Sequence, residues 1–242
     1  MEGLSRTEFA DAVGAAIASV RHFYREVDRL VSGIKEALRE EPDPLKVVRG
    51  STGKGSAAKQ QGRVVLREEY SILFEPETDD EPLVADGGDE DDEEDEEEGD
   101  VRATSKRKSA PAEMDPDQPL LALRLSLSTS HSLPGFEPSL QYAVLGDWLI
   151  GGAKPADSFT VKRYMLRRIP VALGKVTDPS KRVNTTARVG KGKGSGDRRI
   201  SCRVLGGIHT VALYDLDDPK ALDELVSKMK DHWQKVTEEA AA

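Results

Sequence analysis

The first forty residues repeat apolar side chains with the period of a helix that packs along one face. Steps of four and three residues separate these positions, which is the average spacing of a supercoiled seam. A capping box at Ser5 to Glu8 predicts where the helix begins, and Pro42 and Pro44 predict its end near Glu40. We therefore predict a long amphipathic helix within residues 1–42. The seam positions are Val13, Ile17, Val20, Tyr24, Val27, Val31, Ile34 and Leu38.

This seam has two interpretations. Packing on the chain's own sheet is favoured, because most amphipathic helices cover their own core. In the alternative, the helix forms a coiled coil with a second copy or with a partner protein. Charged residues occupy the opposite face, so only one side of the helix can be buried. The residues predicted to form the core seam or the self-association surface are Ile17, Val20, Tyr24, Val27, Val31 and Ile34.

Later segments alternate apolar and polar residues with the period of β-strands. After a Gly-rich loop, residues 63–75 read as a strand. Leu121 to Leu127 alternates so regularly that we predict a strand with one buried and one solvated face. Residues 139–150 predict a further strand, in which Gly146-Asp147-Trp148 has the pattern of a turn with an anchoring aromatic residue. Strands are therefore expected on both sides of the middle of the chain.

The C-terminal third predicts a hairpin, one more strand and a final helix. Residues 182–189 and 198–205 form the hairpin, and 207–216 the additional strand. Residues 159–169 fit either helix or strand, with a short helix slightly favoured because Pro170 would end it. Asp218-Pro219 predicts the start of the last helix, which Met229 and Trp233 would anchor on the sheet.

The order of elements predicts an α+β fold with a mainly antiparallel sheet, on which the N-terminal and C-terminal helices pack. A disordered acidic linker interrupts it: residues 76–118 hold 19 acidic and four basic residues, a balance of −15 within a net charge of −9. Such a segment has too little apolar surface to offset the entropy of ordering. We thus expect a helix at 1–42, a loop and strand at 43–75, the linker at 76–118, and an α+β domain at 119–242.

Positive charge is concentrated between Lys154 and Arg203, a segment that contains 14 basic and three acidic residues. This basic face would attract a phosphate backbone or an acidic protein surface, and the acidic linker would compete for it. Protein is the favoured partner and nucleic acid the alternative, because few aromatic residues and no nucleic-acid motif accompany the charge. The predicted contact residues are Lys162, Arg163, Arg167, Arg168, Arg188, Lys191, Lys193, Arg198 and Arg199.

Other function classes find little support in the sequence. Cys202 has no cysteine to pair with, so we predict a buried structural residue. The four histidines are scattered along the chain, so we predict no metal site and no cofactor. No nucleophile with its base and no carboxylate pair stands out. No apolar stretch predicts a membrane span or a secretion signal. We expect a non-catalytic cytoplasmic interaction or adaptor protein.

Overall fold

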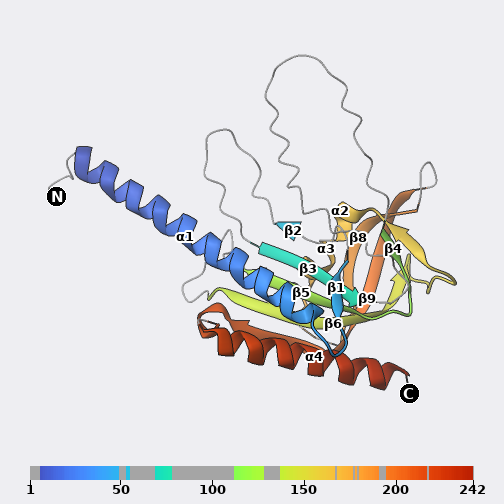
Figure 1. Ribbon diagram of the computed structural model, residues 1–242. Helices are drawn as coiled ribbons and strands as arrows, with labels where there is room; N and C mark the ends of the chain where they lie inside the picture. Colours follow the sequence, from blue (N-terminus) through green and yellow to red (C-terminus); the bar gives the residue numbers. More distant parts are fainter. Residues whose placement is uncertain are drawn as a thin grey trace, which may run out of the picture.

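The computed structural model describes residues 6–48, 53–54, 69–77, 112–127, 137–166, 168–176, 178, 180–190, 195–216 and 218–241. A long N-terminal helix and a C-terminal helix pack against one antiparallel, curled sheet (Figure 1). The predicted α+β class is confirmed. The helices are α1 (Arg6–Arg39), α2 (Arg163–Leu166), α3 (Arg168–Leu173), the 3-10 turn η2 (Leu213–Asp215) and α4 (Pro219–Ala241).

The described strands form a sheet in the order β1-β3-β5-β6-β9-β8-β7-β4, with β2 paired to β3 as well. Every pairing between these strands is antiparallel. Their bounds are β1 Leu45–Val47, β2 Gly53–Lys54, β3 Glu69–Pro76, β4 Ala112–Met114, β5 Leu120–Ser126, β6 Ser139–Ile150, β7 Phe159–Val161, β8 Val183–Val189 and β9 Gly196–Ala212.

The sheet separates two hydrophobic cores. On one face, β3, β5 and β6 pack against α1 and α4; on the other, they pack against α2, α3 and the curled far end of the sheet. Leu121 and Leu123 point into the first core, while Leu120 and Ala122 point into the second. The prediction of a solvated face on this strand was wrong, because the curl of the sheet brings a second apolar layer over it.

Two β-bulges bend the long strands. Beside the first, Asp147 adopts a positive φ of 51°, an uncommon conformation that Asp tolerates better than most residues. At the second, Gly206 and Gly207 have φ of 70° and 101° while β9 continues through them. We predicted two strands at 198–205 and 207–216. Instead, β9 is one bent strand that runs as far as Ala212, because the glycines allow the backbone to turn without leaving the sheet, and Leu213–Asp215 form η2 rather than strand.

The backbone tests two further predictions. The stretch 159–169 is both strand and helix: β7 comes first, then α2 and α3, and Pro170 lies inside α3 rather than ending it. β4 pairs with β7 inside the range predicted as linker, so the 118 boundary was placed too late. Residues 78–111 of that range, and 63–68 of the strand predicted at 63–75, lie outside the described residues.

The last helix begins as predicted. Asp218 Oδ1 accepts a hydrogen bond from the Ala221 N–H at 2.8 Å, which satisfies one of the amides that the first helical turn leaves without a partner. Met229 and Trp233 are both buried against the sheet. Their apolar contacts hold α4 across β6 and β9.

Candidate interaction surfaces

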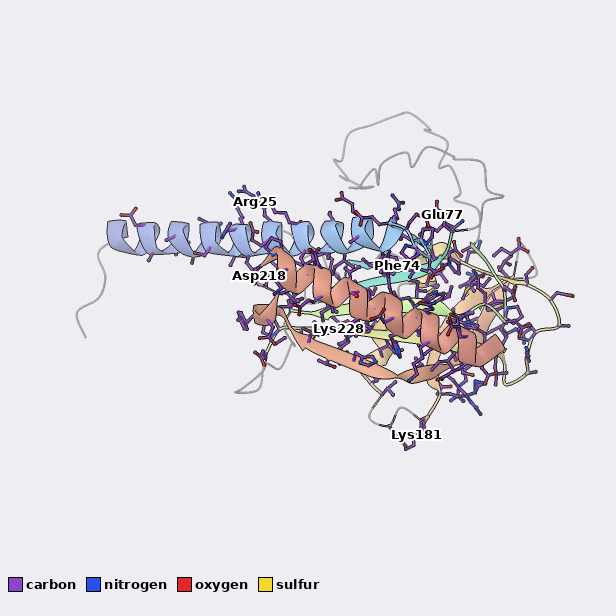
Figure 2. All side chains as sticks on the ribbon, turned by 60° about the horizontal axis from the view of Figure 1, so that its bottom comes forward. Arg25, Phe74, Glu77, Lys181, Asp218 and Lys228 are labelled. Atoms are coloured by element: carbon purple, nitrogen blue, oxygen red, sulfur yellow. The ribbon has the colours of Figure 1, made fainter. Side chains whose placement is uncertain are left out.

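The apolar seam of α1 divides into a buried and an exposed half. Val27, Val31, Ile34 and Leu38 are at most 6% exposed and belong to the core shared with α4. In the other direction the helix continues past the sheet and past the start of α4 (Figures 1 and 2). We call residues 11–25 the projecting segment. The favoured interpretation, packing on the chain's own sheet, therefore applies to the second half of the seam and to Tyr24, which packs against the edge of this core.

The projecting segment exposes large apolar side chains. Val13 is 41% exposed, and Ile17 and Phe23 are each 38% exposed, while Val20 and Tyr24 are half-buried. Phe23 and Tyr24 meet edge to face, with ring centroids 5.6 Å apart. The three aliphatic residues among them follow the spacing of the buried half, so the stripe that packs inside the fold is continued outside it.

Two contacts at the base of the projecting segment fix the direction of the helix. The Tyr70 hydroxyl of β3 donates a hydrogen bond to Asp28 Oδ1 at 2.9 Å. Further along, α1 and α4 approach so closely at Gly33 that a methyl group there would lie 3.1 Å from Leu222 Cδ2. The second half of α1 is thus held on two sides, which gives the projecting segment a rigid base.

The predicted basic face centres on the hairpin of β8 and β9, whose register divides its arginines between two sides. Thr186 pairs with Arg199, and Arg188 with Asp197, so Arg188 and Arg199 share the outer side. Arg198 pairs with Ala187, whose side chain lies in the core, and so occupies the inner side. All three arginines are exposed. Arg199 Nε donates a hydrogen bond to Asn184 Oδ1 at 3.1 Å, which holds it along the outer side.

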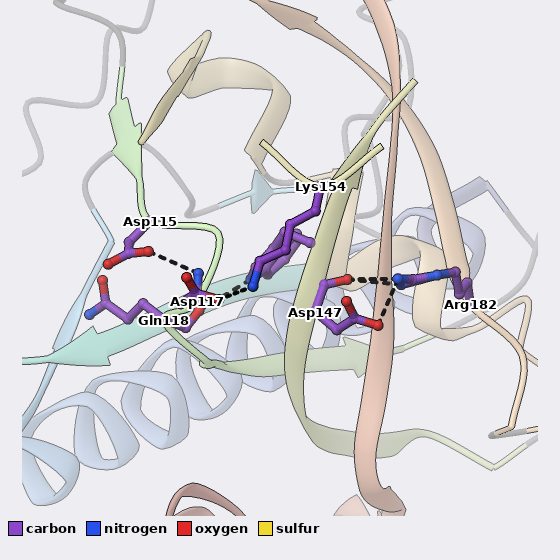
Figure 3. A network of polar contacts seen from close by, with 7 residues as sticks. Asp115, Asp117, Gln118, Asp147, Lys154 and Arg182 are labelled. Carbon is purple, nitrogen blue, oxygen red and sulfur yellow. Dashed lines mark hydrogen bonds and ion pairs between the residues drawn. The ribbon is translucent and has the colours of Figure 1, made fainter. Parts of the chain in front are cut away.

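Asp147 neutralises part of this charge. Arg182 donates a hydrogen bond to the Asp147 carboxylate at 2.7 Å and to its backbone carbonyl at 2.8 Å (Figure 3). Arg203 Nε lies 3.2 Å from the same carboxylate. This role of Asp147 could not be predicted from the sequence, because it depends on the bulge that turns the residue toward β8 and β9.

Two lysines of the window also have carboxylate partners. Lys154 pairs with Asp117, whose hydrogen bond and charge raise the pKa of the ammonium group (Figure 3). Lys181 lies 4.0 Å from Asp178, and hydrogen bonds from Ser180 lower the pKa of that carboxyl. The excess positive charge over the described part of the window is therefore smaller than the residue count suggests.

The remaining predicted contact residues are less concentrated. Arg168 is exposed on α3, which packs against the inner side of β8. Lys162 is half-buried and its backbone N–H donates to the Arg188 carbonyl at 3.0 Å. The side chains of Arg163, Arg167, Lys191 and Lys193 lie outside the described residues. Of the described predicted residues, Arg188 and Arg199 form a common surface, and Arg168 and Arg198 belong to the other side of the hairpin.

A shallow hollow of about 200 Å³ lies between the end of α3 and the start of β8. Lys175, Lys181 and Arg182 line it together with Asp178, but Arg182 is turned to Asp147. Its lining residues include no serine, cysteine or histidine. The hollow thus offers charge but no nucleophile of these kinds.

Cys202 and two of the histidines make contacts within the described fold. Burial raises the pKa of the Cys202 thiol to about 12, so it stays protonated and unreactive, as a buried structural cysteine would. His209 of β9 and His232 of α4 meet with ring centroids 4.5 Å apart, and His209 also stacks on Tyr142. No group of three or more potential metal ligands occurs within the described ranges.

No family model, curated protein or solved structure matches this chain. None of the described helices combines the length and apolar character needed to cross a membrane.

Proposed function

We propose that this chain is a non-catalytic interaction protein and that the projecting segment of α1 is its docking surface. The observation that carries the proposal is the continuation of the buried seam into solvent at Val13 and Ile17. Burial of a Val or Ile side chain in an interface contributes about 1.5–3 kcal/mol. A free helix of this length is only marginally stable in water, so a partner that covers the stripe would also stabilise the helix.

The proposed setting is the cytoplasm. A single buried cysteine suits a reducing compartment, where disulfides play no part in stability. The binding role needs no cofactor.

The test compares two double variants of the full chain as affinity baits in an extract of the native host. Val13→Glu with Ile17→Glu places two charges on the stripe; Ala15→Glu with Ser19→Glu adds the same charges at the same spacing on the exposed opposite face. We expect the wild type and the control to retain the same discrete proteins, and the stripe variant to lose them. Equal retention by all three proteins would refute the docking surface.

A second candidate, polyanion binding that includes nucleic acid, is favoured by one observation: Arg188 and Arg199 lie together on the exposed outer side of the hairpin. The two arginines would contact successive phosphates, and the affinity would fall as the salt concentration rises. The nearby Arg203 shares Asp147 with Arg182 and adds little free charge.

The hairpin supplies its own control for this candidate. We expect Arg188→Glu with Arg199→Glu to lower the salt concentration at which the chain elutes from heparin or single-stranded DNA. Arg168→Glu with Arg198→Glu makes the same charge change on the other side and should have a smaller effect. Identical elution of the wild type and both variants would rule out binding through the outer side.

A further inference from the structure

The projecting segment has an asymmetric distribution of charge around an uncharged centre. Residues 12–20 carry no ionisable side chain. Asp11 lies before them, and Arg21 and Arg25 lie after them; all three are exposed. One end of the stripe is therefore flanked by negative charge and the other by positive charge.

This arrangement is self-complementary when two copies run in opposite directions. Asp11 and Arg21 lie five residues on either side of Ala16. A twofold axis at Ala16 would thus place each Asp11 opposite Arg21 of the second copy. With Val13 and Val20 at d positions and Ile17 at an a position, Asp11 and Arg21 fall at b and e, on the same edge of the stripe.

A parallel pair would lack these contacts. Aligned in the same direction, each Asp11 would lie level with Asp11 of the other copy and each Arg21 level with Arg21. Like charges brought together in this way oppose association. The charge pattern therefore selects the antiparallel orientation.

The centre of the segment also permits two helices to approach closely. Gly14, Ala16 and Ala18 surround the proposed axis, and a methyl group added at Gly14 would lie more than 4 Å from every atom of the described residues outside its own stretch of helix. Glycine within an exposed helix costs about 1 kcal/mol relative to alanine, and no contact inside the described fold accounts for it here. The close approach of a neighbouring backbone would explain why a glycine occupies position 14.

We infer that the projecting segment pairs with the same segment of a second copy of this chain, antiparallel about Ala16, with Asp11 of each copy bound to Arg21 of the other. The inference rests on the proposed function, since it names the partner of that docking surface. Two short helices bury an area at the small end of specific interfaces. The dimer should accordingly dissociate in the micromolar range and present the two folded bodies at opposite ends.

The first measurement is the molar mass of the purified full chain by sedimentation equilibrium over a range of micromolar concentrations. We expect a monomer–dimer equilibrium for the wild type and for Ala15→Glu/Ser19→Glu, and a monomer for Val13→Glu/Ile17→Glu. At high dilution, where pairing is absent, circular dichroism of each variant should match the wild type in thermal midpoint, because the substituted side chains lie outside the core.

Charge exchange then tests the orientation. Asp11→Lys and Arg21→Glu should each weaken dimerisation roughly tenfold, because each replaces two attractive pairs by two repulsive ones. An equimolar mixture of the two variants should recover dimerisation, because both ends of the mixed dimer then pair opposite charges. The Asp11→Lys/Arg21→Glu double variant should recover it as well.

Each result has a defined consequence. A wild type that stays monomeric overturns self-pairing, while the retention of other proteins from the extract still tests the proposed function separately. A dimer that persists in Val13→Glu/Ile17→Glu would show that the projecting segment is not the dimer interface. A dimer lost in that variant but not recovered in the charge-exchanged mixture overturns the antiparallel register.

Discussion

His209 and His232 touch across the boundary between sheet and helix, with ring centroids 4.5 Å apart and ring planes inclined by 70°. His209 is exposed at the bulge of β9, and His232 is half-buried on α4 beside Gly206. Burial lowers the pKa of His232; the charges of His209 and Lys235 lower it further, against a backbone hydrogen bond at Leu205 that raises it. The fold therefore favours the neutral imidazole.

The first prediction is that the fold loses stability at acid pH. Because the folded-state pKa lies below the ordinary value of 6.5, the unfolded chain takes up the proton first as the pH falls. This contribution to stability is complete above that value and is lost as the pH drops through the lower folded-state pKa. Urea unfolding between about pH 8 and about pH 5 should show it.

Replacing the histidine tests this prediction. His232→Gln should flatten the dependence of unfolding free energy on pH over this range, because it removes the group whose pKa is lowered in the folded chain. Equal slopes for the wild type and His232→Gln would contradict the assignment.

The second prediction concerns Arg124 of β5, whose side chain is 13% exposed and pairs with Glu69, which is 24% exposed. Arg124 also donates to Gln141 Oε1 at 2.7 Å, while its Nε has no partner within the described structure. Glu69→Ala would leave a mostly buried cation without its counter-charge and should destabilise the fold by about 2–4 kcal/mol.

Asp117 provides a control for Glu69, because it also pairs with a basic residue but at an exposed site. Asp117→Ala removes the partner of Lys154 at an exposed site, where solvent screens the pair, and should destabilise the fold far less than Glu69→Ala. Chemical denaturation of both variants measures the difference; similar losses for the two would show that the Arg124 pair is not buried as described.

The third prediction tests the division of the α1 seam with two isoleucines. Ile34 is fully buried between the sheet and α4, so Ile34→Ala should destabilise the monomer by about 2–5 kcal/mol. Ile17→Ala, at a position 38% exposed, should cost less than about 1 kcal/mol. Thermal denaturation at high dilution, where pairing is absent, gives both values, and comparable losses would place Ile17 in the core.

The fourth prediction concerns the face of β5 that the sequence suggested was solvated. Ala122 is fully buried in the core next to α3, so Ala122→Asp should destabilise the fold by more than about 3 kcal/mol by burying an unpaired carboxylate. Thr186→Asp, on the exposed outer side of β8, should be nearly neutral. Soluble yield and thermal midpoint measure the effect of each substitution. A stable Ala122→Asp protein would show that this face of β5 is solvated.

Much of the fold could be predicted because it is encoded locally. The 3.5-residue repeat placed α1, the alternation from Leu121 placed β5, and Asp218-Pro219 marked the start of α4. For the candidate surfaces, strand alternation already implied that the neighbouring Arg198 and Arg199 would point to opposite sides, although the predicted set treated them as one face.

Tertiary structure decided the rest. The contact between His209 and His232, the second apolar layer over Ala122, and the two arginines held by Asp147 join residues that are distant in sequence. The length of sheet available beneath α1 determined that its seam is buried from Val27 onward and exposed at Ile17. The spacing of apolar residues depends only on the local sequence, so it predicts which face of a helix or strand can be buried. Which part of that face is covered depends on where the neighbouring elements end, and only the packed fold determines those ends.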